Sequence, residues 1–206
     1  MANVINATST GNGGLVSTGD DSGILNIQTN ETTAITVDAS QKVSFTNPIQ
    51  GGSITSGTAV ASTSGTSIDF TGIPSWVKRI TVMFNGVSLN ASVNFLVQIG
   101  SGSITTTGYN STGSYLPGGT PGIISSTAGF VMLADSSAFT ISGTLTIFNI
   151  SSNIWVSSHA IKSATTSSGT GGGDVTLSGV LDRVRITSTN GTATFDAGSI
   201  NILYEG

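Results

Sequence analysis

The residue types that most often carry chemistry are rare in this chain and do not form a recognisable catalytic set. His159 is the single histidine, and no serine–histidine–aspartate or cysteine–histidine arrangement accompanies it. We therefore expect His159 to be a partly buried or interface side chain rather than a catalytic base or a metal ligand. The ten acidic residues are scattered along the chain, and none of them resembles the paired-carboxylate site of a glycan-processing enzyme. The sequence thus predicts a protein that is not an enzyme.

Two short segments could hold a ligand. Asp20 and Asp21 precede Ser22-Gly23 and could bind Ca²⁺ at a turn, but the EF-hand spacing is absent. Carboxylates in turns usually cap backbone amides, so we expect a structural turn here. The run Gly169–Gly173 has no following Lys-Ser or helix, so it predicts a flexible loop rather than a phosphate site. The chain has no cysteine, which excludes disulfides and thiolate metal sites. No metal or cofactor is expected.

The charged residues favour isolated ion pairs over a binding site. The chain carries six Lys and Arg and a formal net charge of −4, so nucleic acid is not expected as a partner. The carboxylates of Asp69 and Asp182 are the expected partners of nearby basic residues, in surface or inter-subunit ion pairs. The basic residues in question lie in strand-like segments and are Lys78, Arg79, Arg183 and Arg185.

The segment 100–129 has the composition of a binding surface. It contains two prolines and many glycines, and loops of this length are uncommon in compact domains unless they have a function. Tyr109, Asn110 and Tyr115 lie there among Ser, Thr and Gly, as in an antibody paratope, which suggests recognition of a polysaccharide or a protein epitope. The alternative is that the tyrosines hold the loop against its own domain or a neighbouring subunit.

The elements that position these residues are predicted to be β-strands. Only 8% of the residues are charged and 28 are glycine, while Ser and Thr fill much of the rest. The densest strand signal runs over 67–99, where apolar residues alternate at 68–70 and 93–99. Residues 76–84 are apolar on both faces, as in a central strand, and Asn85-Gly86 predicts a tight turn. We expect an all-β fold.

Further strand-like segments follow, and they predict a jelly-roll-like sandwich over 58–206. Their number, eight or more, and the long connections favour a jelly roll over an immunoglobulin-type sandwich. The segments after the central strand are 130–133, 139–150, 153–162, 175–177, 183–188 and 193–204.

The N-terminal quarter is predicted to be an arm and a stalk. Residues 1–14 are polar and Gly-rich, so we expect an extended attachment arm or disorder. Residues 15–57 read as short strands followed by a linker, with too few apolar residues to form a core alone. Three copies around a common axis could bury them, and without disulfides the chain should gain stability from such a homotrimer. The alternative is a meander packed on the sandwich of the same chain. The predicted trimer core is Leu25, Ile27, Ile35, Val37, Val43 and Phe45.

Two parts of the chain resemble known virion proteins. The segments 22–29, 32–38 and 41–45 resemble the short-stranded shaft segments of tailed-bacteriophage fibre proteins. The block IDFTGIPSWVKRITV, with the closing segments LDRVRITSTNG and FDAGSINILY, is similar to a terminal domain of many phage tail-fibre and related virion proteins.

The resemblance implies a virion structural protein made in the host cytoplasm and exposed on the particle surface. The N-terminal arm would contact other virion proteins, the stalk would trimerise, and the C-terminal domain would bind a host receptor. In the alternative, a protein with the same fold acts as a head fibre or decoration protein and stabilises the capsid. The resemblance brings no catalytic residues. The N-terminus does not read as a signal peptide, and no apolar run is long enough for membrane insertion.

Overall fold

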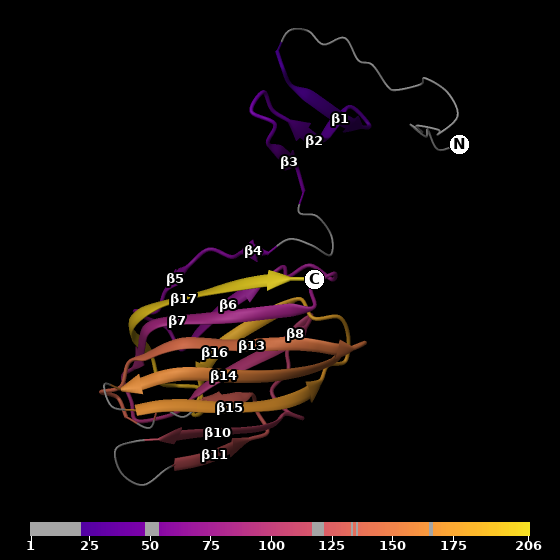
Figure 1. Ribbon diagram of the computed structural model, residues 1–206. Helices are drawn as coiled ribbons and strands as arrows, with labels where there is room; N and C mark the ends of the chain where they lie inside the picture. The colour runs from indigo at the N-terminus through magenta and orange to yellow at the C-terminus, as the bar shows by residue number, and fades with distance from the viewer. Residues whose placement is uncertain (1–21, 48–53, 117–121, 133, 135, 165–166) are drawn as a thin grey trace. The chain divides into compact units, whose positions relative to one another are not determined.

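The computed structural model describes residues 22–47, 54–116, 122–132, 134, 136–164 and 167–206. The chain divides into two compact units, Met1–Ile49 and Gln50–Gly206 (Figure 1). Strands and turns make up the described parts of both, so the all-β prediction is confirmed. The predicted arm 1–14, the Asp20-Asp21 turn and residues 51–53 of the predicted linker lie outside the described residues.

The first unit contains a three-stranded antiparallel sheet with the order β1-β2-β3. Its strands are β1 (Leu25–Thr29), β2 (Thr32–Val37) and β3 (Val43–Phe45). Asn30 and Glu31 join β1 to β2 with φ of 50° and 61°, the left-handed pair that a two-residue hairpin loop of type I′ requires. The carboxylate of Asp38 accepts hydrogen bonds from the N–H groups of Ser40 and Lys42 and so holds the second turn.

The second unit is a β-sandwich of a nine-stranded and a five-stranded sheet. The larger sheet runs β11-β10-β15-β14-β13-β7-β17-β4, with β5 also paired to β17, and the smaller runs β12-β8-β16-β6, with β9 paired to β8. The larger sheet contains β4 (Thr55–Ser56), β5 (Val60–Ala61), β7 (Arg79–Leu89), β10 (Asn110–Leu116), β11 (Gly122–Ser126), β13 (Ile141–Ser151), β14 (Ile154–Ala164), β15 (Ser167–Thr176) and β17 (Phe195–Glu205). The smaller contains β6 (Ser67–Thr71), β8 (Phe95–Ser101), β9 (Ser103–Ile104), β12 (Phe130–Met132) and β16 (Arg183–Ser188).

The connections make the sandwich jelly-roll-like, because consecutive strands repeatedly change sheet. The chain crosses between the sheets from β6 to β7, from β7 to β8, and again from β15 to β16 and β16 to β17. The central β13-β14-β15 segment is instead a meander within the larger sheet. Ser and Thr alternate with apolar residues along these strands, so one face of each sheet packs inward.

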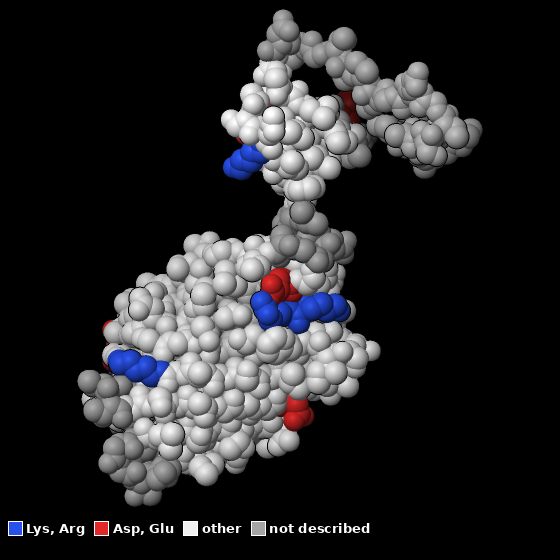
Figure 2. Space-filling view, in the orientation of Figure 1, with Lys and Arg blue, Asp and Glu red and all other residues white. Residues whose placement is uncertain are grey.

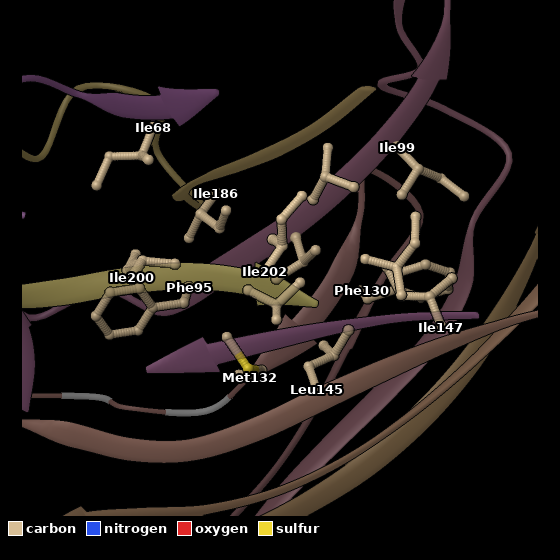
Figure 3. Close-up of a cluster of buried hydrophobic side chains, with 14 of the residues drawn as sticks. Ile68, Phe95, Ile99, Phe130, Met132, Leu145, Ile147, Ile186, Ile200 and Ile202 are labelled. Atoms are coloured by element: carbon tan, nitrogen blue, oxygen red, sulfur yellow. The ribbon is translucent and has the colours of Figure 1, made fainter. Parts of the chain in front are cut away.

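The core lies between the two sheets, where their apolar faces meet (Figure 3). Ile68 and Phe70 of β6 are buried, as the alternation in the sequence predicts. Phe95, on β8, packs against Phe195, on β17, with ring centroids 6.3 Å apart, so this contact joins the two sheets. Central strand β7 is flanked by β13 and β17 and places Ile80 and Val82 in the core.

The structure corrects the predicted turn at Asn85-Gly86. Both residues lie inside β7, where the register with β13 and with β17 shifts, so they form a β-bulge instead of a turn. Gly86 has a φ of 63°, and its N–H donates to Ser142 Oγ at 2.9 Å. The dipeptide favours left-handed backbone in either setting, and only the neighbouring strands select the bulge.

The predicted flexible loop at Gly169–Gly173 is also wrong, since these residues belong to β15, between β14 and β10. A Cβ atom on Gly171 would lie 2.4 Å from His159 Cε1 and 2.4 Å from the carbonyl oxygen of Thr112. Because glycine has no side chain, Gly171 leaves room for the His159 ring and for the neighbouring strand β10.

The domain boundary differs from the predicted one. It falls between Ile49 and Gln50, whereas the sequence placed residues 54–57 in a linker. Thr55 and Ser56 form β4, which pairs with Tyr204 and Leu203 of β17, so this segment belongs to the sandwich.

Candidate functional site

The small sheet of the first unit carries a complete apolar face. Cross-strand pairing aligns Leu25 with Val37 and Val43, and it aligns Ile27 with Ile35 and Phe45. Residues paired directly across a sheet, and residues two apart along a strand, share a face. The six predicted trimer-core residues therefore form two adjacent rows on one side of the sheet. We call them the apolar face of the first unit.

This apolar face is largely exposed in the single chain. Leu25, Ile27, Val43 and Phe45 are 52%, 48%, 53% and 45% exposed. None of the described residues of this unit is buried, so the sheet has no core of its own. The opposite side is polar, and Thr36 Oγ1 there donates to Asn26 Oδ1 at 2.8 Å. An exposed apolar face of this kind marks a surface that is suited to contact another apolar surface.

Tyr109, one of the three predicted receptor contacts, is buried and cannot contact a receptor in this conformation. It is 2% exposed, and its hydroxyl accepts from the Ile99 N–H at 2.8 Å and donates to the Ile99 carbonyl at 3.2 Å. Its ring meets Phe130 edge to face at 5.0 Å. Burial raises the pKa of this phenol well above its usual value. Tyr109 thus holds its segment against β8, which is the alternative that the sequence left open.

The other two predicted contacts, Asn110 and Tyr115, do not form one surface. Both belong to β10, so the predicted long loop is partly a hairpin with β11, and residues 117–121 lie outside the described residues. Asn110 is exposed, donates to Asp174 Oδ2 at 3.3 Å, and lines a hollow of about 390 Å³ at the β10–β11 edge. Tyr115 is half-buried and pairs with Gly169. About five residues of extended strand, roughly 17 Å, separate the two.

His159 lies on the inner face of β14 and is 6% exposed. Burial lowers the pKa of its imidazole to about 4, so the ring is neutral at pH 7. Its Nε2 has no hydrogen-bond partner among the described residues, and the same holds for Trp155 Nε1, Ser157 Oγ and Ser163 Oγ on the same strand. These four side chains form a polar strip inside the sandwich. The strip lies beside the glycines of β15.

Two of the four basic residues, Arg183 and Arg185, form the predicted ion pairs within the chain. Arg79 pairs instead with Glu205, and Lys78 Nζ donates a hydrogen bond to Asn149 Oδ1 at 3.4 Å. Arg183 Nε lies 2.7 Å from Asp182, and the same distance separates Arg185 Nε from Asp69. Arg183 holds the pKa of Asp182 below its usual value. Within the described ranges, no three His, Asp or Glu residues are grouped as a metal site. On the face seen in Figure 2, charged side chains are sparse and leave a broad uncharged area over β13, β14 and β15.

A polar groove lies on the outer face of the five-stranded sheet. Outward positions of β8 and β16 form its floor, where Leu96, Gln98 and Thr187 are only 4%, 6% and 8% exposed. The groove has a volume of about 350 Å³. We call it the β8–β16 groove; it is lined by Thr66, Ser67, Leu96, Gln98, Thr106, Ala128, Arg185, Thr187, Ser188, Thr189, Asn190 and Gly191.

Comparisons of the chain with protein-family models, with curated proteins and with solved structures found no match. Among the parts of the chain that the structure describes, no helix is long and apolar enough to cross a membrane.

Proposed function

We propose that this chain is a homotrimeric fibre protein of a bacteriophage virion. In this proposal, residues 1–14 dock on the particle, the apolar face of the first unit forms the trimer, and the sandwich binds a receptor on the host surface. The resemblance of both units to phage fibre segments supports the class of protein. The apolar face is the observation that supports trimer formation.

Covering the apolar face contributes favourable free energy to association. Complete burial of an aliphatic or aromatic side chain is worth about 1.5–3 kcal/mol, so covering the exposed half is worth roughly 1 kcal/mol. Leu25, Ile27, Val43 and Phe45 are each about half exposed, and together they contribute roughly 4 kcal/mol per chain. Three sheets around a common axis would each present this face to the other two. The polar side, with Asn26 and Thr36, would face water.

Trimerisation would also serve binding by the sandwich. Three sandwiches on one stalk can engage a repetitive surface at once, and the resulting avidity exceeds the affinity of each copy. The low charge of the chain, 8% of its residues, suits a receptor that is recognised by hydrogen bonds and shape rather than by charge.

Light scattering on the full chain tests the assembly. Wild-type protein should have three times the chain mass of 20.6 kDa. Phe45→Asp places a charge on the apolar face and should yield monomers, whereas Ser44→Asp, on the opposite side of the same strand, should remain trimeric. A wild-type chain that stays monomeric at micromolar concentration would rule out the trimer.

Adsorption tests the role in the virion. Particles that lack the protein should no longer adsorb to host cells but should keep their DNA on heating. If they adsorb normally and lose DNA on heating, the protein is a capsid decoration protein instead.

A further inference from the structure

The β8–β16 groove is walled by polar side chains that other hydrogen bonds hold in place. Gln98 Nε2 donates to the Ala128 carbonyl at 2.8 Å, and Thr187 Oγ1 donates to the Thr66 carbonyl at 2.8 Å. Asn190 Oδ1 accepts from Ser188 Oγ at 2.9 Å and also from the N–H groups of two following residues at 3.0 Å each. A ligand would therefore meet groups that are already ordered, which lowers the entropy cost of binding.

The same side chains keep unused hydrogen-bonding groups. Gln98 retains its amide oxygen as an acceptor, and the Thr187 hydroxyl retains its lone pairs. The Asn190 amide nitrogen has no acceptor among the described residues, because the hydrogen bonds of this side chain all use its oxygen. Arg185 Nε and Nη2 donate to the Asp69 carboxylate at 2.7 Å each, and Nη1 remains available as a donor. The groove thus offers donors and acceptors together.

The lining of the groove is close to neutral overall. Among the described residues, Arg185 is the only charged one in the lining, and the Asp69 carboxylate balances its charge. Hydroxyl groups from Thr66, Ser67 and Thr106 add further neutral contacts. A volume of about 350 Å³ is within the range of small-molecule sites. A ligand that matches this lining is uncharged, compact and rich in hydroxyl groups.

We infer that the β8–β16 groove binds a neutral saccharide and is the receptor site of the sandwich. The claim that this saccharide is a receptor rests on the proposed function. The saccharide site itself depends only on the groove. Arg185 is a positioned donor in this site, and Thr106 is an exposed residue of its rim.

Saturation-transfer NMR on the full chain tests the site with a panel of neutral di- and trisaccharides of glucose, galactose, mannose, rhamnose and N-acetylglucosamine. Arg185→Ala removes a donor, and Thr106→Trp fills the groove from its exposed rim. Arg183→Ala and Thr107→Trp are the matched controls, because Arg183 forms the neighbouring ion pair and Thr107 is the next exposed residue, and neither lines the groove.

The wild-type chain and both controls should bind at least one neutral saccharide, and both groove variants should weaken that binding by about tenfold or more. Circular dichroism and light scattering on each variant show whether the fold and the assembly are retained. Binding to no member of the panel, or equal binding by Thr106→Trp and Thr107→Trp, overturns the site. A saccharide-binding chain that is monomeric or absent from virions instead refutes the proposed function and leaves the site standing.

Discussion

Acidification should destabilise the sandwich through the buried imidazole of His159. The ring is 6% exposed, and burial lowers its pKa from 6.5 to about 4. Between these values the unfolded chain binds a proton that the folded chain does not, so the free energy of unfolding falls as the pH falls. Below about pH 4 both states are protonated and this contribution is constant.

The size of the effect follows from the pKa difference. Each pKa unit corresponds to about 1.4 kcal/mol, so the total loss between pH 6.5 and pH 4 is on the order of 3 kcal/mol. Urea unfolding at a series of pH values, at fixed protein concentration, measures it, and the fluorescence of buried Trp155 reports on the sandwich.

A neutral variant isolates the histidine. His159→Gln cannot take up the proton, so its stability should be nearly flat over the same window. Asp182, whose pKa lies below its usual value of 3.8, loses its contribution only at lower pH. If wild type and His159→Gln lose stability in parallel between pH 6.5 and pH 4, the buried imidazole is not the cause.

Two further substitutions test the packing inside the sandwich. Gly171→Ala places a methyl group 2.4 Å from the Thr112 carbonyl oxygen and should cost about 2 kcal/mol or more of unfolding free energy. Thr170→Ala, on the exposed side of the same strand, should cost far less in the same urea titration, and equal losses would contradict the close approach. Tyr109→Phe leaves the Ile99 N–H unpaired and should cost about 2 kcal/mol while binding of saccharide stays unchanged. If Tyr109→Phe keeps its stability but binds saccharide more weakly, Tyr109 contacts the ligand instead.

The glycine-rich strand and the polar strip on β14 explain one another. Gly171 and Gly173 lie opposite His159 and Ser157 in the pairing of β14 with β15. Small residues on one strand accommodate the ring and hydroxyl groups of the other, which would otherwise not fit between the sheets. The strip keeps polar groups that have no hydrogen-bond partner among the described residues.

The sequence alone determined the features that depend on local alternation. A period of two along a strand places side chains on one face whatever the neighbouring strands are. For this reason it predicted the apolar set of the first unit, here represented by Leu25 and Phe45, and the inward residues Ile68 and Phe70 of the sandwich. The ion pair between Arg185 and Asp69 was also within reach, because both residues lie in segments with clear strand patterns.

Only the tertiary structure decided the features that depend on which strands are neighbours. Tyr109 has the composition of a binding loop around it, yet its hydroxyl pairs with Ile99 because β8 lies beside that segment. Gly169–Gly173 reads as a flexible loop, but close approach of β14 and β10 makes glycine the residue that fits. The β8–β16 groove gives no signal in the sequence, because Gln98 and Asn190 are brought together only by the sandwich. Alternation is a property of one strand, whereas pairing, close approach and grooves are properties of several strands at once.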